Sequence, residues 1–257
     1  MPDEAASTRS QMWGSCGDRH GSAMPMVLMY HSVAPYEQDP YGITVSPARF
    51  ERQMRWLRRR GLNGVSMGTL LTAWRAGRAR GLIGLTFDDG YADFVEYALP
   101  VLARYGFGAT AFPVAGLLGG TNDWDPEGPR KQLMTAEQVR QAADAGIEIG
   151  SHGLRHVSLP AVPVAALAAE AAESRAILRA ASGQDVAGFC YPFGHVDAQA
   201  VDAARAAGYS YGCGIWRTPE TGLFSIPRAF VDDHDKGVHM IAKEIKHLLT
   251  WGHCWAY

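Results

Sequence analysis

Short apolar runs alternate with amphipathic segments from Pro25 onward, and this alternation restricts the fold more than any other feature of the sequence. Apolar runs of strand length separated by helix-length segments are typical of parallel strands joined by crossover helices. The eight candidate strands are residues 26–31, 62–67, 82–87, 108–114, 147–152, 187–192, 210–214 and 224–231. The seven candidate helices are residues 47–60, 68–79, 91–105, 135–145, 162–182, 197–207 and 235–249. We therefore predict an α/β fold, an incomplete or distorted (β/α) barrel of about seven to eight parallel strands in a single domain.

Several helix boundaries carry local start and stop residues. Ser46 precedes Pro47, and Thr135 opens the run T-A-E-Q. Each of these two residues therefore stands in the N-cap position of a predicted helix. Gly146 and Gly208 stand where a helix ends and the next strand begins, because glycine readily adopts the left-handed conformation that closes a helix. These residues predict helices that begin near 47 and 135 and end before 146 and 208.

One domain is expected because 257 residues with 47% hydrophobic content can bury a full core and no linker interrupts them. We assign residues 25–257 to this domain. Residues 1–24 are polar and contain no apolar run of secretory length, so we interpret them as a disordered tail and expect a cytoplasmic protein. No apolar stretch approaches the roughly 20 residues that cross a bilayer, and we expect no membrane span.

The charge pattern argues against a nucleic-acid partner. The formal net charge is −2 and charged residues make up 19% of the chain, without the basic field that phosphate backbones attract. Three arginines at 58–60 close a predicted helix, where cations complement the helix dipole. No C-x-x-C pair occurs, so we expect free thiols in a reducing compartment. The four cysteines are Cys16, Cys190, Cys213 and Cys254.

Two aspartates follow the predicted strand 82–87 directly. In (β/α) barrels, side chains at the carboxyl ends of the strands line the active face, so Asp88 and Asp89 are candidate site residues. Alternation along the chain aims the two carboxylates differently, so that one can bind a metal while the other acts as a base. The alternative is an Asp-Asp-Gly turn with solvated acids, which is common.

Two histidines, His152 and His156, occur four residues apart at and after the end of the predicted strand 147–152. On a helical turn this spacing brings both imidazoles to one side, where neutral ring nitrogens bind zinc. With Asp89 they supply two nitrogens and one oxygen, the ligand set of a catalytic zinc that keeps positions open for water and substrate. We predict one divalent metal, zinc by default, with cobalt, nickel or manganese as alternatives. Asp88 then remains free to deprotonate water.

Three stretches of the chain resemble motifs of the polysaccharide deacetylases, carbohydrate esterase family 4, also called the NodB-homology domain. They are T-F-D-D-G (86–90), S-H-x-x-x-H (151–156) and F-C-Y-P-F-G (189–194), and the resemblance extends from about residue 26 to 231. The resemblance implies that Asp88 is the catalytic base and that Asp89, His152 and His156 hold the metal. It also implies that the backbone N–H of Phe193 helps to stabilise an oxyanion.

The third motif departs from the family pattern. Many members carry an arginine that orients the base, whereas Cys190 stands at the corresponding position here. Arg228, in S-I-P-R-A, is the candidate replacement, because it resembles a recurrent P-R element of a related branch; the alternative is a surface arginine at a strand end.

The general acid is expected at His31. The stretch M-Y-H-S-V at 29–33 resembles the opening of the branch related to poly-N-acetylglucosamine deacetylases, in which an early histidine has this role. The alternative is a structural histidine at a strand end. Histidines near the C-terminus, where many members place their acid, follow no convincing buried strand; they are His234, His239, His247 and His253.

Substrate contacts are expected from the segment 119–125 and from the third motif. Trp124 offers a flat aromatic surface that suits the apolar face of a sugar ring, although a tryptophan is more often a packing residue. Asp123 and Asp125 are candidates for binding sugar hydroxyls or, equally, turn residues. We add Tyr191 as a further candidate contact.

Three functions are consistent with these residues. The leading prediction is metal-dependent removal of N-acetyl groups from an amino sugar, either a polymer, an oligosaccharide or a small glycoside. Hydrolysis of a different small N-acylated molecule is the alternative enzyme, because the same metal, base and acid would serve it. A carbohydrate-binding protein that has lost turnover is the third, and the missing third-motif arginine favours it.

Overall fold

The protein is described by a computed structural model that covers residues 24–215 and 222–251. The tail predicted at 1–24 therefore lies almost wholly outside the described residues, as do Cys16, His253 and Cys254. The strands are β1 (Val27–Tyr30), β2 (Ser32–Val33), β3 (Thr44–Val45), β4 (Asn63–Val65), β5 (Leu82–Phe87), β6 (Thr110–Ala111), β7 (Glu148–Ile149), β8 (Gly188–Cys190), β9 (Tyr211–Cys213) and β10 (Ala229–Phe230). The helices are α1 (Pro47–Arg59), α2 (Met67–Arg75), α3 (Leu99–Tyr105), α4 (Ala136–Asp144), α5 (Val164–Ser182), α6 (Ala198–Ala206) and α7 (Gly237–Trp251), with short turns η1 (Phe94–Ala98), η2 (Ala115–Leu117), η3 (Leu159–Ala161) and η4 (Pro192–Gly194).

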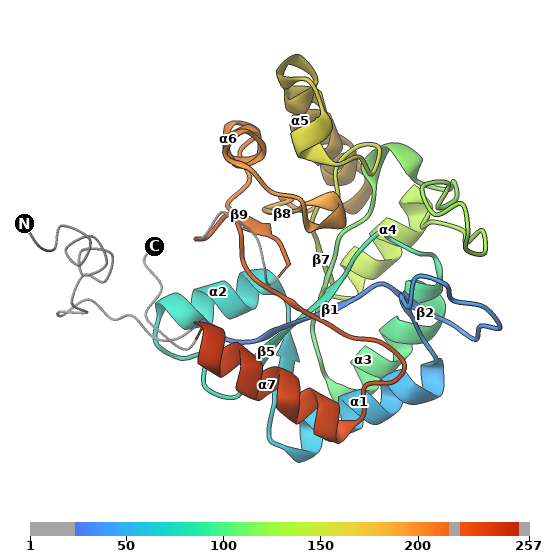
Figure 1. Cartoon of the computed structure of the whole chain (residues 1–257), viewed down its shortest axis with the longest axis vertical. Helices are drawn as coiled ribbons and strands as arrows, with labels where there is room; N and C mark the ends of the chain where they lie inside the picture. Colours follow the sequence, from blue (N-terminus) through green and yellow to red (C-terminus); the bar gives the residue numbers. More distant parts are fainter. Residues whose placement is uncertain (1–23, 216–221, 252–257) are drawn as a thin grey trace, which may run out of the picture.

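The strands pair in parallel around a common centre. The main sheet has the order β10-β1-β5-β6-β7, and β4 pairs with the first half of β5. Strands β8 and β9 form a second pair, which single parallel bridges connect to the chain after β7 and before β10. Helices surround these strands, with α1, α2 and α7 on one side and α5 and α6 on the opposite side (Figure 1). This is the distorted (β/α) barrel that the alternation predicts.

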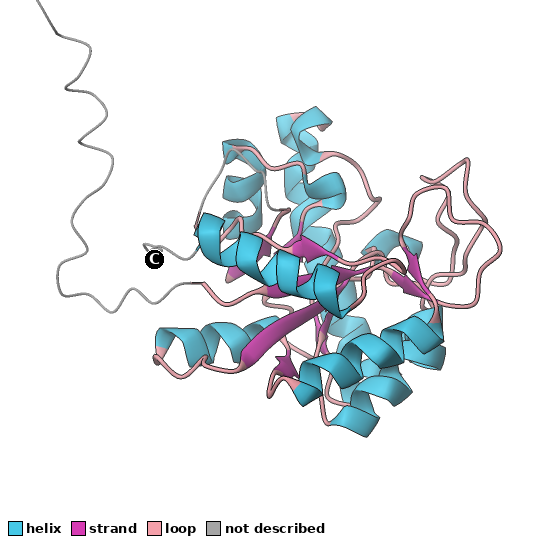
Figure 2. Cartoon of the chain, turned by 60° about the horizontal axis from the view of Figure 1, so that its bottom comes forward, coloured by secondary structure: helices cyan, strands magenta, loops and turns pink. Residues whose placement is uncertain are grey.

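All seven predicted helices and all eight predicted strand positions are present; β5 spans the predicted residues 82–87, and the other predicted strands are shorter than expected. The segment expected as a strand at 224–231 pairs over only Ala229–Phe230, and β2 and β3 were not predicted because two-residue strands leave no periodic pattern. Long loops gather at one end of the molecule (Figure 2).

The local helix signals are confirmed in part. Thr135 forms a full capping box with Gln138, and Gly146 and Gly208 have the expected left-handed backbone. Ser46 stands at the N-cap of α1, but its hydroxyl donates to Asp233 Oδ1 at 2.7 Å instead of capping the helix. Among the described residues, no helix is both long enough and apolar enough to cross a membrane.

Aromatic packing fixes the ends of the two central strands below the site. Tyr30 at the end of β1 stacks on Phe87 at the end of β5, with ring centroids 5.3 Å apart. Phe50 of α1 and Phe94 of η1 pack edge-on against Phe87, and all four rings are buried. His31 and Asp88 directly follow Tyr30 and Phe87, so this packing holds the backbone of both residues in place.

Candidate metal and catalytic site

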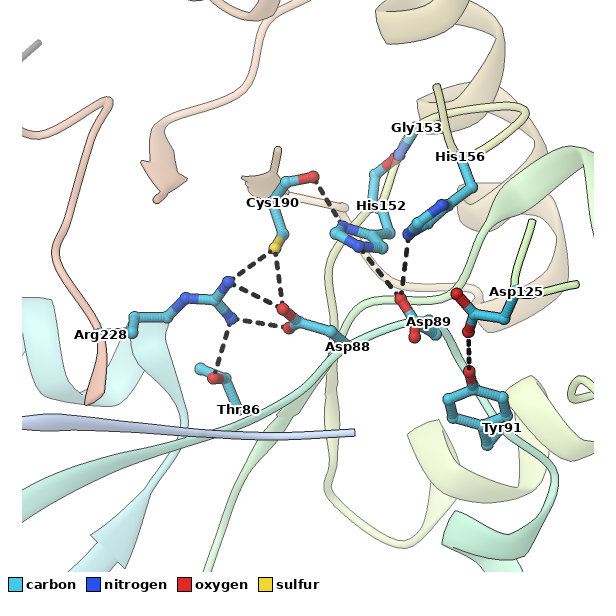
Figure 3. A network of polar contacts seen from close by, with 11 residues as sticks. Thr86, Asp88, Asp89, Tyr91, Asp125, His152, Gly153, His156, Cys190 and Arg228 are labelled. Atoms are coloured by element: carbon cyan, nitrogen blue, oxygen red, sulfur yellow. Dashed lines mark hydrogen bonds and ion pairs between the residues drawn. The ribbon is translucent and has the colours of Figure 1, made fainter. Parts of the chain in front are cut away.

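The two aspartates after β5 are buried and point to different partners (Figure 3). Asp88 still belongs to the ladder, since its N–H donates to Tyr30 O at 2.9 Å, but Asp89 has a left-handed backbone with φ of 68°. Gly90 follows with φ of 75°, and a Cβ there would lie 2.7 Å from the Cα of Pro113. A turn is therefore present at Asp-Asp-Gly, but its acids are not solvated, and the alternative of solvated turn acids is wrong.

The two histidines reach Asp89 from a loop, not from a helical turn as predicted. Gly153 and His156 both have left-handed backbones, with φ of 79° and 56°, so the chain between the histidines curls without helical hydrogen bonds. Both imidazoles nevertheless face the same carboxylate oxygen. His152 Nε2 lies 3.2 Å and His156 Nε2 lies 3.3 Å from Asp89 Oδ1.

The spacing of these three ligand atoms fits a divalent metal. Metal–ligand bonds of about 2.0–2.2 Å in a tetrahedral site separate neighbouring ligand atoms by about 3.3–3.5 Å, close to the two separations at Asp89. His152 Nδ1 contacts Cys190 O at 2.8 Å, which assigns the N–H to Nδ1 and leaves the lone pair of Nε2 facing Asp89. Burial raises the pKa of Asp89, but the contacts with His152 and His156 outweigh it and hold that pKa well below its usual range.

His156 is held in place by aromatic rings. The indole of Trp124 stacks on it with centroids 4.1 Å apart, and Phe193 packs edge-on at 4.6 Å. Its Nδ1 is buried and has no hydrogen-bond partner among the described residues. The ring of this candidate ligand is therefore oriented by packing, whereas a backbone carbonyl orients His152. His156 therefore occupies at least one face of the Trp124 indole. The prediction that Trp124 stacks on a sugar did not include this contact.

A second set of possible ligands is Asp88, His152 and Cys190. Arg228 already binds both carboxylate oxygens of Asp88, through Nη1 at 2.6 Å and Nη2 at 2.8 Å. A metal there would have to displace a guanidinium, so the geometry favours Asp89, His152 and His156 as the metal set.

Arg228 is buried, so the alternative of a surface arginine is wrong. Besides Asp88, it donates to Thr86 Oγ1 and Gly214 O, each at 3.0 Å, and to Cys190 Sγ at 3.0 Å. Burial raises the pKa of Asp88, but the charge and hydrogen bonds of Arg228 prevail and lower it. Arg228 thus provides, from the chain just before β10, the guanidinium that the third motif lacks.

The thiol of Cys190 completes this cluster. Burial raises the pKa of the thiol well above its usual value, so the S–H stays protonated and donates to Asp88 Oδ2 at 3.4 Å. A larger side chain at this position would compete with Arg228 for the same space beside Asp88.

A cavity of about 430 Å³ opens over the metal set, and His31 lines it together with Asp88 and Asp89. His31 packs against Phe230 with centroids 5.6 Å apart, and its Nδ1 is buried without a hydrogen-bond partner in residues 24–215 and 222–251. None of the other described histidines outside the metal set lines this cavity: His247, for example, contacts Met24 O at 2.6 Å elsewhere. His31 is therefore in place for the predicted acid role.

Of the predicted substrate contacts, Trp124, Tyr191 and Asp125 line the cavity, as does Phe193. Asp123 does not; it is exposed and pairs with Arg130. Residues that the sequence interpretation missed also line the cavity: Met29, Tyr41, Ile43, Ile215 and Phe230.

Tyr91 was also missed. It is buried beside Asp89, and its hydroxyl donates to Asp125 Oδ2 at 3.4 Å (Figure 3). Its position directly after Asp-Asp-Gly was the one available signal for it.

The fold and site together define a class: a (β/α) barrel with an Asp-His-His metal set and an arginine-bound carboxylate at the carboxyl ends of its strands. The family model described as polysaccharide deacetylase matches residues 76–212, more than half of the chain, and the chain belongs to this family. The match includes Asp88, Asp89 and both histidines of the metal set, but neither His31 nor Arg228.

Two relatives illustrate the similarity. A putative polysaccharide deacetylase YxkH of Bacillus subtilis (strain 168) is 29% identical over 188 residues, which are 72% of this chain and 62% of the relative. A poly-beta-1,6-N-acetyl-D-glucosamine N-deacetylase of Escherichia coli (strain K12) is 28% identical over 135 residues, which are 49% of this chain and 20% of the relative. The chain thus spans less than two thirds of either protein.

Among solved structures, the Streptococcus pyogenes deacetylase PplD in complex with acetate superposes with a TM-score of 0.72 and 22% identity. The superposition covers 86% of this chain and 98% of that one. At this identity the likeness confirms the fold.

Proposed function

We propose that this chain is a metal-dependent N-deacetylase that hydrolyses the acetamide of an N-acetylated amino sugar. One observation carries the proposal: a buried metal set of Asp89, His152 and His156 lies beside an ionised carboxylate, Asp88, at the base of one cavity. Neither group alone indicates hydrolysis, but a metal site next to an ionised carboxylate outside the ligand set is what amide hydrolysis by activated water needs.

The residues divide the reaction between them. A divalent metal, when bound, lowers the pKa of water and polarises a carbonyl oxygen. Asp88 accepts the proton of the attacking water, and Arg228 keeps Asp88 ionised and fixes the direction of its oxygens. His31 donates a proton to the departing amine nitrogen, and the backbone N–H of Phe193 stabilises the developing oxyanion.

The substrate class is proposed from the cavity and the relatives. Aromatic side chains from three segments, Tyr41, Trp124 and Phe193, line the cavity and suit the apolar faces of sugar rings. Relatives that are named for the deacetylation of poly-beta-1,6-N-acetyl-D-glucosamine support N-acetylglucosamine units as the substrate. We propose zinc as the metal, in keeping with two imidazoles and one carboxylate.

The test is acetate release by the purified chain from N-acetylglucosamine oligomers with β-1,6 and β-1,4 linkages, from a small N-acetyl glycoside and from simple N-acyl amides. Each is assayed after chelation and after zinc, cobalt, nickel or manganese is added back. Chelator-sensitive release from the sugars, restored by metal, is expected. Acetate release from the simple amides alone would mean that the substrate is a different N-acylated molecule and not an amino sugar. Metal binding without release from any compound would favour a binding protein.

A matched pair of variants compares the loss of a carboxylate in the site with the loss of a carboxylate on the surface. Asp88→Asn is expected to abolish acetate release, whereas Asp202→Asn, on the exposed face of α6, is expected to leave it unchanged.

A further inference from the structure

Helix α7 exposes a row of large aliphatic side chains to solvent. The spacing of three and four residues places them on one helix face, and we call them the α7 stripe. Its members are Val238 (66% exposed), Ile241 (36%), Ile245 (52%), Leu248 (54%) and Leu249 (76%). The opposite face, with Met240 and His247, is buried against the barrel, so the stripe is not the face that folds the helix onto the core. Half of the exposed large hydrophobic side chains in residues 24–215 and 222–250 belong to this one helix.

Basic residues surround the stripe. Arg60, at the end of α1, pairs with Glu244 of α7 at 3.1 Å, and Arg80, after α2, shares a surface cavity with Glu244 and Leu248. Lys246 lies on α7 itself, whereas Lys243 lies on the side of α7 that faces the barrel and pairs with Asp235 at 3.1 Å. We call Arg60, Arg80 and Lys246 the basic rim.

The charge of this side differs from that of the rest of the chain. Residues 47–81 and 232–251 include α1, α2, α7 and the aspartates that contact these helices, and they hold 12 lysines and arginines against 5 acidic residues. From chain totals of 24 and 26, the remaining residues hold 12 against 21. The small net charge of −2 therefore conceals a basic side. The helices of this side, α1, α2 and α7, lie together (Figure 1).

We propose that the α7 stripe and its basic rim dock the protein on a membrane surface that contains anionic lipids. An interfacial helix needs an apolar face for the boundary between headgroups and acyl chains, and basic residues beside it for anionic headgroups. The stripe and the rim supply both. A soluble polyanion would pair with the rim but leave the stripe in water. A second copy of this chain, docked by a two-fold axis through α7, would bring two basic rims together.

The docking surface is separate from the catalytic cavity. No member of the α7 stripe lines that cavity, although α7 packs beside Arg228 and Phe230 of the strand region before it. Membrane binding and turnover on a soluble oligomer are therefore expected to vary independently, and the inference does not rest on the proposed function.

Flotation of the purified full chain with lipid vesicles tests the proposal. Vesicles of phosphatidylcholine alone are compared with vesicles in which about a third of the lipid is phosphatidylglycerol, at low and high salt. Binding to the anionic vesicles, weakened by salt, is expected. Ile245→Glu and Leu248→Glu are each expected to lower binding at least about tenfold, and Arg80→Glu about fivefold or more.

Val164→Glu is the matched control, because Val164 is an equally exposed aliphatic residue (65%) on α5, on the other side of the barrel. It is expected to bind vesicles like the wild type. Circular dichroism and acetate release from a soluble oligomer check that each variant is folded, with no change expected in either.

Three results would overturn the proposal. In the first, the wild type would not bind anionic vesicles. In the second, Val164→Glu would lose as much vesicle binding as Ile245→Glu. In the third, light scattering would find a dimer that Ile245→Glu converts to a monomer, without vesicle binding by either form; the stripe would then be an interface between two copies.

Discussion

Replacement of Arg228 by methionine tests the buried pair on which the catalytic base depends. Both groups are almost fully buried, and two hydrogen bonds of 2.6 and 2.8 Å join them. Methionine fills similar space but leaves Asp88 without a charged partner, and removal of one partner from a buried pair costs about 3–5 kcal/mol. Because domains of this kind are stable by about 5–15 kcal/mol, the variant is expected to fold with a clearly lower urea midpoint.

The pH dependence of the Arg228→Met variant has a defined sign. In the wild type the folded-state pKa of Asp88 lies below 3.8, so its ionised form stabilises the fold above that pH, and this contribution is lost as the pH falls through the depressed pKa. Without Arg228, burial raises the pKa of Asp88. The acid limb of kcat/KM is therefore expected to move to higher pH.

Two controls accompany this variant. Arg228→Lys keeps the charge but not the two-fold hydrogen bonding, and is expected to fall between wild type and Arg228→Met in both measurements. Arg60→Met removes an exposed arginine and is expected to change stability by less than about 1 kcal/mol. An unchanged urea midpoint and acid limb in Arg228→Met would refute the reasoning.

Three further variants test the surroundings of the site. Trp124→Ala is expected to weaken metal binding about tenfold, because the indole orients His156; a competition assay with a chelating dye measures this, and a change in KM alone would show that Trp124 serves only the substrate. Thr135→Ala removes a capping box and is expected to cost about 1 kcal/mol in thermal unfolding, with activity per folded molecule unchanged. Gly90→Ala forces a Cβ toward Pro113 and is expected to destabilise the protein by more than about 1 kcal/mol and to lower activity, as the turn positions Asp89; wild-type behaviour would mean that this turn tolerates a side chain.

Periodicity in the sequence was sufficient for the architecture. Each predicted helix corresponds to an observed one, since amphipathic segments of nine residues or more leave a measurable pattern. The strands of two residues, β2 and β3, left none. The seven or eight parallel strands followed from connection rules that hold without knowledge of any contact.

The sequence predicts the candidate metal ligands of the site, but not the residues that support them. Asp88, Asp89, His152 and His156 follow predicted strands, so topology alone places them at one end of the barrel. The reason given for the convergence of the histidines was wrong, because a left-handed loop replaces the expected helical turn.

Contacts across the chain could not be read from local patterns. Arg228 reaches Asp88 over a separation of 140 residues, and the stacking of Trp124 on His156 depends on a loop path that no periodicity encodes. For Trp124 the sequence predicted a contact with a sugar ring, whereas the structure places the indole against the imidazole of His156.

The most direct test of the central claim is to measure bound metal and turnover in the same preparations of wild type, Asp88→Asn and His152→Ala. One zinc per chain is expected in the wild type and in Asp88→Asn, with acetate release only in the wild type. His152→Ala is expected to lose both the metal and turnover. Full activity in either variant, or loss of metal from Asp88→Asn with retention in His152→Ala, would contradict the division of roles between Asp88 and the metal set.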